Sequence, residues 1–312
     1  MTIKPGIKDF VWMAAGAAVL LVGTLLFLRF HRSQNPAEQL ALKAERVDLV
    51  NRTNLALTSA AEAEKSSVLA ITDEDSRTYA DQARAAAAQV QQAYKELTGL
   101  MPSGATPEEK RLLDQFAADF AQFQRIDAQV LDLAVKNTNL KAFSLAFGPA
   151  AEAIKTMDAA LSRVVTKTAP MAEARQAAVL AFEAKCAALR IQALLPPHIA
   201  EESDQRMDEF EAQMTKQDDE VRKDLSGLSA VPALAADPDL AAAAAAYDQF
   251  SKLRTQVLAL SRENTNVRSL AISLNQSRKI MFQCQDDLSA LQRVILAQPI
   301  AGVDYGRYDS PR

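Results

Sequence analysis

The chain has 312 residues, of which 49% are hydrophobic and 24% charged, and this length suffices for two ordinary domains with short extensions. Alanine and leucine supply most of the apolar side chains, and with 9 glycines and 6% aromatic residues the composition favours helices over sheets. The formal net charge of −4 and the pI near 5.4 exclude the basic surface typical of nucleic-acid-binding proteins.

The sequence lacks the ligand sets of the common metal and redox centres. Its two cysteines, Cys186 and Cys284, are too far apart for a CxxC motif, and His31 and His198 belong to no metal-binding motif. We therefore expect no metal, no other cofactor and no enzymatic activity.

An uninterrupted apolar run, FVWMAAGAAVLLVGTLLFL, covers residues 10–28 and is long enough for a helix to cross roughly 30 Å of hydrocarbon. A cleaved signal peptide has a shorter apolar core followed by small residues, whereas Arg29 and Arg32 flank an aromatic residue and His31 directly after this run. We predict a single membrane helix over 10–30, preceded by an N-terminal tail over 1–9.

The orientation of this helix is ambiguous. More basic residues follow the span than precede it, which mildly favours a cytoplasmic body, but a long domain translocates largely regardless of charge. Gly16 and Gly23 lie one heptad apart among alanines, so another membrane helix could pack closely here, although small residues are also common in such spans.

After a linker over 31–39, the chain repeats itself with a period of roughly 127 residues. The segment FAQFQRIDAQVLDLAVKNTNLKAFSLAF at 120–147 aligns without a gap with YDQFSKLRTQVLALSRENTNVRSLAISL at 247–274. We predict an all-α protein with two tandem antiparallel four-helix bundles, the first copy over 40–168 and the second over 169–297, followed by a flexible tail over 298–312.

Capping residues, prolines and heptad spacing predict where the helices begin and end. A capping residue before a proline, in Thr106-Pro107 and in Asp237-Pro238, marks the start of the third helix of each copy. The expected helices cover residues 37–71, 74–99, 107–136, 139–167, 170–195, 200–227, 237–263 and 266–297.

Three breaks are expected within this pattern. Pro196-Pro197 ends the first helix of the second copy, and Gly148-Pro149 kinks the fourth helix of the first copy, a feature that the second copy lacks. An Asn-Thr-Asn segment, at 137–139 and again at 264–266, separates the third helix from the fourth. The alternative is one continuous helix over 239–297, which contains no glycine or proline.

Apolar residues at heptad spacing predict the seams of the bundles. They are Phe116, Phe120, Phe123 and Val130; Phe143, Phe147, Ile154 and Leu161; and Met281, Cys284, Leu288, Leu291 and Ile295. Cys186 lies at the same spacing between Phe182 and Leu189. If the first and last helices of the second copy are neighbours, Cys186 and Cys284 form either a disulfide or two small buried thiols.

Three stretches carry a resemblance to a known family: SVLAITDEDSRTYADQA from Ser67, the Thr-Pro-Glu-Glu segment from Thr106, and ENTNVRSLAISLNQSRK from Glu263. They resemble the four-helix-bundle sensor domain of methyl-accepting chemotaxis proteins. This resemblance implies a sensing or binding module on the periplasmic side of the inner membrane, working as a dimer.

The chain departs from that family because it shows no second apolar run and no methylatable signalling hairpin, and it ends in AQPIAGVDYGRYDSPR. We therefore expect any signal to pass through a homodimer or a membrane partner. The alternative function is a structural tether or scaffold whose bundles dock other proteins.

The Asn-Thr-Asn segments are the candidate ligand site, because paired amides beside a cation could receive a small polar or carboxylate ligand. The alternative is that these asparagines cap helices or fix their register. The candidate residues are Asn137, Asn139, Lys141, Asn264, Asn266 and Arg268.

Overall fold

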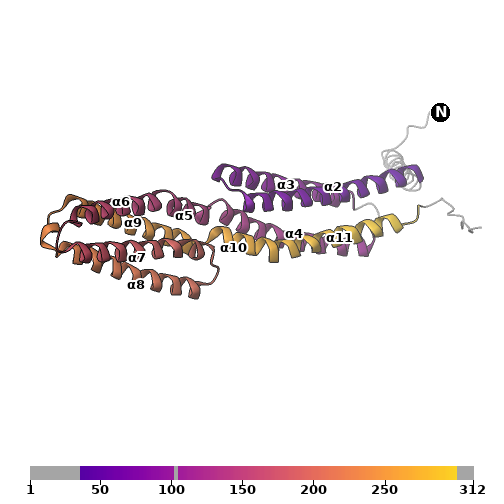
Figure 1. Cartoon of the computed structure of the whole chain (residues 1–312). Helices are drawn as coiled ribbons and strands as arrows, with labels where there is room; N and C mark the ends of the chain where they lie inside the picture. The colour runs from indigo at the N-terminus through magenta and orange to yellow at the C-terminus, as the bar shows by residue number, and fades with distance from the viewer. Residues whose placement is uncertain (1–35, 102–104, 301–312) are drawn as a thin grey trace, which may run out of the picture. The chain divides into compact units, whose positions relative to one another are not determined.

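The computed structural model describes residues 36–101 and 105–300 (Figure 1). Within these ranges the secondary structure is entirely helical, which confirms the predicted all-α class. The predicted membrane helix over 10–30, with Gly16 and Gly23, lies outside the described residues. Among the helices that are described, none combines the length and the apolar character that crossing a membrane requires.

The helices agree with the predicted ones to within a few residues at most ends. Their bounds are α2 Pro36–Leu69, α3 Asp73–Gly99, α4 Pro107–Ala134, α5 Thr138–Phe147, α6 Pro149–Thr168, α7 Ala174–Ala200, α8 Asp204–Ser229, the 3₁₀ turn η1 Pro232–Leu234, α9 Pro238–Glu263, α10 Thr265–Ile272, the π-helical segment η2 Ser273–Ser277, and α11 Arg278–Ala297.

Side-chain caps fix the predicted starts of the third helices. The backbone N–H of Thr106 donates to Glu109 Oε2 (2.7 Å) while the N–H of Glu109 donates to Thr106 Oγ1 (3.2 Å), which is a reciprocal capping box. Asp237 Oδ1 accepts from the backbone N–H groups of Asp239 (2.8 Å) and Leu240 (3.1 Å). Both starts were correctly predicted from the capping residue and the proline that follows it.

The Asn-Thr-Asn segments do break the helices. Asn137 (φ 53°) and Asn264 (φ 52°) both adopt the left-handed conformation, which asparagine tolerates better than most residues. The alternative of one continuous helix over 239–297 is therefore wrong.

The predicted break at Gly148-Pro149 is confirmed, since α5 ends at Phe147 and α6 begins at Pro149. The second copy has no break there, as predicted, but its helix is not regular. Under the 127-residue shift that places Thr138 on Thr265, Gly148 corresponds to Asn275, which lies within η2.

The predicted break at Pro196-Pro197 is wrong. Helix α7 runs through both prolines to Ala200. Leu195, His198 and Ile199 are buried, so continuing the helix for one more turn buries side chains that offset the backbone hydrogen bonds lost at the prolines.

The described helices form two compact units, each assembled from separate stretches of the chain. Unit 1 contains the described residues up to Ala60, those of Ala85–Gln122, and those from Ile280 onward; unit 2 contains Ala61–Arg84 and Phe123–Lys279.

In unit 1, α2 and α11 are antiparallel neighbours: Lys43 Nζ donates to Leu296 O (2.6 Å), and Gln285 Nε2 donates to Thr58 Oγ1 (3.1 Å). The rings of Tyr94 on α3 and Phe116 on α4 lie 5.7 Å apart. Segments of α2, α3, α4 and α11 thus make up the first bundle.

In unit 2, α6, α7, α8 and α9 surround one continuous apolar core, with α7 against α8 and α6 against α9 (Figure 1). Alanines are numerous in this core, and its largest fully buried side chains include Tyr247, Phe250, Ile191 and Leu195.

This division differs from the predicted copies over 40–168 and 169–297. The helices are combined differently. Helix α11, the last part of the second copy's fourth helix, belongs to unit 1, whereas α10 and η2 belong to unit 2 together with α5 to α9. The physical reason lies in the connection between α6 and α7, because residues 169–173 form a short turn that makes these two helices antiparallel neighbours.

Part of the predicted core is exposed. Phe143, Phe147, Phe182 and Leu189 were predicted to be buried, yet all four are exposed, with Phe182 at 66%. Alanines adjacent in register are buried instead, because small side chains let helices approach closely. The buried set is Ala142, Ala146, Ala181, Ala184 and Ala188.

The predicted bridge between the cysteines is not formed, and both thiols are free. Cys186 is half-buried on α7 in unit 2, whereas Cys284 is buried on α11 in unit 1. Burial, with the nearby charges of Asp119 and Asp287, raises the pKa of the Cys284 thiol to about 12, so this thiol stays protonated and unreactive.

Candidate functional site: the Asn-Thr-Asn junction

The two Asn-Thr-Asn segments lie against each other in unit 2 and form a junction with approximate twofold symmetry. The backbone N–H of Thr138 donates to Thr265 Oγ1 (3.2 Å), and the N–H of Thr265 donates to Thr138 Oγ1 (3.1 Å). One residue further, the N–H of Asn139 donates to Asn266 Oδ1 (3.2 Å) and the N–H of Asn266 donates to Asn139 Oδ1 (3.1 Å).

These bonds cap two helices at once. The first backbone N–H groups of a helix have no partner within it, and the residues that precede α5 and α10 provide no side-chain cap. The threonine and asparagine of the opposite copy supply the missing acceptors. Each fourth helix therefore begins on a cap that the other copy provides.

The remaining amide groups of the asparagines are also used. Asn139 Nδ2 donates to Asn264 Oδ1 (2.7 Å) and to Ile199 O (2.7 Å). Asn266 Nδ2 donates to Asn137 Oδ1 (2.9 Å), and Asn264 Nδ2 donates to the carbonyl oxygen of Glu201 (2.7 Å). The predicted ligand amides are thus brought together, and they bind one another and nearby carbonyl groups.

The two predicted cations behave differently from each other. Lys141 Nζ lies 3.1 Å from Asp73 Oδ2, and Asp73 Oδ1 also accepts from Asn137 Nδ2 (3.0 Å). The hydrogen bond from Asn137, together with Lys141, lowers the pKa of Asp73 against a smaller opposing effect of burial. Arg268 is exposed on α10. Ligand binding at the junction stays a prediction.

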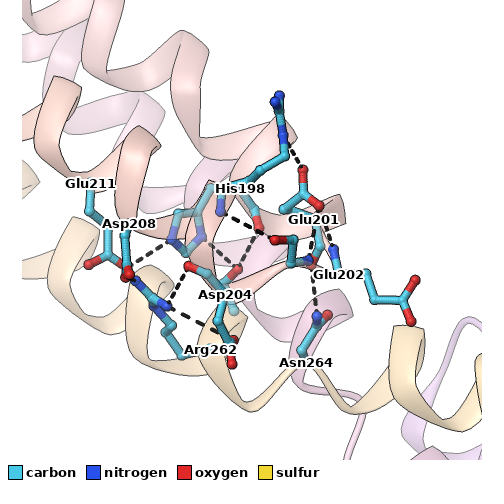
Figure 2. Close-up of polar contacts among 11 residues, drawn as sticks. His198, Glu201, Glu202, Asp204, Asp208, Glu211, Arg262 and Asn264 are labelled. Atoms are coloured by element: carbon cyan, nitrogen blue, oxygen red, sulfur yellow. Dashed lines mark hydrogen bonds and ion pairs between the residues drawn. The ribbon is translucent and has the colours of Figure 1, made fainter.

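An ionic cluster built around the buried ring of His198 adjoins the junction (Figure 2). The ring of His198, at the end of α7, is fully buried; its Nδ1 lies 2.8 Å from Ser261 Oγ and its Nε2 lies 2.9 Å from Glu211 Oε1. Ser261 Oγ donates its hydrogen to the carbonyl oxygen of His198 (3.0 Å). An ionised Glu211 can only accept, so His198 Nε2 is the donor in this contact.

Arg262 completes this cluster. Its Nε donates to Glu211 Oε1 (2.7 Å), and its other nitrogens bind Asp208 and the backbone of Asp204. Burial tends to raise the pKa of Glu211, but the hydrogen bonds from Arg262 and His198 outweigh burial and hold this pKa below its usual range. The pKa of Arg262 is raised, first by its hydrogen bond to Glu211.

The chemistry of this cluster is structural. Ser261 is buried and its hydrogen is bound to a carbonyl oxygen, so it is not placed to act as a nucleophile. The cluster instead ties α7, α8 and α9 together. Sequence reasoning missed it because Glu211 and Ser261 are 13 and 63 residues from His198, and no local motif joins them.

Comparison with known proteins bears on this part of the chain. Residues 50–181 match a family model described as a four helix bundle sensory module for signal transduction. Over these residues the chain is similar to that sensory module. The match confirms the resemblance over most of the first copy and the first residues of α7. No curated protein matches the chain in sequence.

Proposed function

We propose that this protein is a membrane-anchored sensor that binds a small molecule outside the inner membrane and passes the signal to a partner. The observation that carries the proposal is the match of residues 50–181 to a sensory module for signal transduction. The apolar run at 10–28 is long enough to serve as the anchor. A periplasmic body is favoured because sensory modules of this kind lie there in membrane receptors.

A partner is part of this proposal, either a second copy of the chain or another membrane protein. Exposed apolar side chains on α7 support association: Val179, Phe182 and Leu189 are all exposed and follow the spacing of a heptad seam. Gly16 and Gly23 offer a second contact surface within the membrane helix. The function proposed is non-enzymatic.

The junction is the proposed ligand site, with a small polar or carboxylate ligand. Four amides gather there in one cluster, and Lys141 and Arg268 are the nearby cations. The scaffold function remains the second candidate, because the amides already satisfy one another's hydrogen bonds.

A thermal-shift screen of amino acids and organic acids on the full chain tests the ligand proposal, since specific binding must stabilise the folded state. The expected result is a hit whose shift is lost in Asn264→Ala and kept in Asn275→Ala, an exposed asparagine on η2. A screen without hits, or a hit that both variants retain, would favour the scaffold.

The topology is tested separately with a reporter fused after Arg312. Activity of a reporter that works only in the periplasm supports a sensor facing outward. Activity of a cytoplasmic reporter at the same position would contradict it.

A further inference from the structure

Two acidic side chains are buried in unit 2, within the part of the chain that matches the sensory module. Glu64 on α2 is 1% exposed and Asp127 on α4 is 4% exposed. Asp127 takes a heptad position between Phe123 and Val130, where the seam is otherwise apolar. Carboxylates are seldom buried this deeply unless a cation or several donors satisfy them.

The two carboxyl groups are only partly satisfied. Glu64 Oε2 accepts a hydrogen bond from Ser277 Oγ, at the end of η2. Glu64 Oε1 and Asp127 Oδ1 are buried and have no hydrogen-bond partner among the described residues. Each of these oxygens therefore lacks a donor that ionisation would require.

The charged groups near Asp127 explain why its pKa is raised. Burial and the Glu64 carboxylate together raise the pKa of Asp127 to about 7, and Arg84 on α3 opposes them only in part. The guanidinium of Arg84 is exposed and already pairs with Asp81 (3.0 Å) and Asp132 (3.6 Å). The contact from η2 is the neutral hydroxyl of Ser277.

We propose that Glu64 and Asp127 form a proton-binding site through which the sensory module responds to the pH of its surroundings. A proton from water adds to one carboxylate oxygen of Asp127 and forms an O–H group. The negative charge that faces Glu64 is thereby removed, and the new O–H supplies a donor where both buried oxygens lacked one. The use of this site in signalling rests on the sensory function proposed above.

The site lies where three helical elements meet, so a change of charge there acts on all three. Glu64 joins α2 to η2 through Ser277, and Asp127 belongs to α4. π-Helical segments such as η2 occur frequently at functional sites. We infer that the charge on Asp127 alters the balance between η2 and regular helix.

A bound metal ion fits this site less well than a proton. Calcium takes about six to eight oxygen ligands, whereas the site offers two carboxyl groups and one hydroxyl. In the described part of the chain, no group of three or more histidine, cysteine or acidic residues is placed to hold a metal ion.

The test is a pH titration of the full chain by carbon-13 NMR of labelled aspartate and glutamate carboxyl groups. We expect one aspartate signal with a midpoint near 7, absent in Asp127→Asn and present in the control Asp114→Asn, an exposed residue of the same helix. In Glu64→Gln this midpoint should fall by about one pH unit or more, because a neighbouring negative charge is removed.

Three results would overturn the proposal. One is that no aspartate signal of the wild-type chain titrates near pH 7, a result that does not depend on any variant folding and that the signal of Asp287, whose pKa is raised to about 6, does not mask. Another is that the midpoint moves when calcium chloride is added, which would mark a cation site.

The third concerns the use of the site. Self-association of the full chain in lipid vesicles should change across the titration, and this change should be lost in Asp127→Asn. If the carboxyl group titrates but association does not respond, the pH-sensing role is wrong. The titration needs no signalling partner, so its outcome is independent of the thermal-shift screen.

Discussion

Asp127 and Arg254 occupy the same position in the two copies, under the shift that places Thr138 on Thr265, yet their surroundings are opposite. Arg254 is 14% exposed, and its Nη1 lies 3.0 Å from Asp218 Oδ1. Asp127 is 4% exposed and has one oxygen with no partner among the described residues. One copy thus holds a paired charge where the other holds an unpaired acid.

The partners of Arg254 explain the difference. Asp218 also accepts from the hydroxyl of Tyr247 (2.6 Å) and from Arg222 Nε (2.9 Å). Burial tends to raise the pKa of Asp218, but these bonds and the charge of Arg254 hold it below its usual range. Under the same shift, the first copy has Phe120 in place of Tyr247, and phenylalanine lacks the hydroxyl that Tyr247 donates to Asp218.

The comparison shows that burial alone does not decide whether a charged group is stable. A paired charge holds helices in one arrangement, whereas an unpaired acid shifts its pKa and becomes sensitive to pH. At this position the first copy therefore carries an unpaired acid with a raised pKa, and the second copy carries a paired charge.

The largest expected effect is at the junction, where every amide is satisfied. Asn139→Ala removes the side-chain hydrogen bonds that Asn139 donates to Asn264 Oδ1 and to the carbonyl oxygen of Ile199, and the one it accepts from the backbone N–H of Asn266. We expect the free energy of unfolding to fall by about 2–4 kcal/mol, because buried polar groups lose their partners. Urea denaturation measures this; a loss no greater than that of the exposed control Asn275→Ala would contradict it.

A smaller loss is expected at the paired charge of the second copy. Arg254→Gln removes the ion pair between Arg254 and Asp218. Asp218 keeps its bonds from Tyr247 and Arg222. The free energy of unfolding should fall by about 1–3 kcal/mol at neutral pH. The same denaturation experiment checks it, and an unchanged or increased stability would show that the pairing contributes nothing.

Replacing Asp127 is expected to raise the free energy of unfolding, unlike the two substitutions above. Its folded pKa of about 7 lies above the ordinary value of 3.8, so the folded state binds more protons and stability decreases as pH rises between these values. Asp127→Asn removes this penalty and should stabilise the protein by about 1–3 kcal/mol near pH 8, and by little near pH 4.

Denaturation curves at several pH values check this prediction. Asp287 contributes a dependence of the same sign, because burial and Asp119 raise its pKa to about 6, so the comparison must be between the variant and the wild type. A variant whose stability follows the wild-type pH profile throughout would show that Asp127 is not the titrating group.

The smallest effect on stability is expected on the exposed face of α7. Phe182→Ser should change the free energy of unfolding by less than about 0.5 kcal/mol, since its side chain is 66% exposed. It should nevertheless weaken self-association, measured by cross-linking of the full chain in membranes. Leu55→Ser is the matched control, because Leu55 is exposed on α2 without apolar neighbours three or four residues away; equal losses in both variants would argue against a specific surface.

The sequence predicted the helices well because capping residues and apolar periodicity act locally. It did not predict which helices pack together. Two similar copies offer two similar fourth helices, and either one could close either bundle on apolar pattern alone. The choice depends on the turn after α6 and on the junction, where the contacts join residues 127 positions apart.

The core faces were also only partly predictable. Helix α7 carries large apolar residues on one face and alanines on another, and the heptad spacing of Phe182 and Leu189 favoured the wrong face. The alanine face of α7 is the one that is buried, because small side chains allow the helices to pack closely. The Asn-Thr-Asn segments were correctly identified as important, but their partners are each other, and no single-copy pattern indicates reciprocal contacts.

The reciprocal junction between the two Asn-Thr-Asn segments is the contact on which the proposed site and the packing of unit 2 depend most. The double variant Thr138→Cys/Thr265→Cys tests it directly, in a chain whose own cysteines are replaced by serine, because the two hydroxyl oxygens lie 3.2 Å apart. Oxidation should give a disulfide within one chain, identified by mass spectrometry after proteolysis, because the two side chains already lie in contact. Free thiols after oxidation, or a disulfide that forms only between two chains, would contradict the junction.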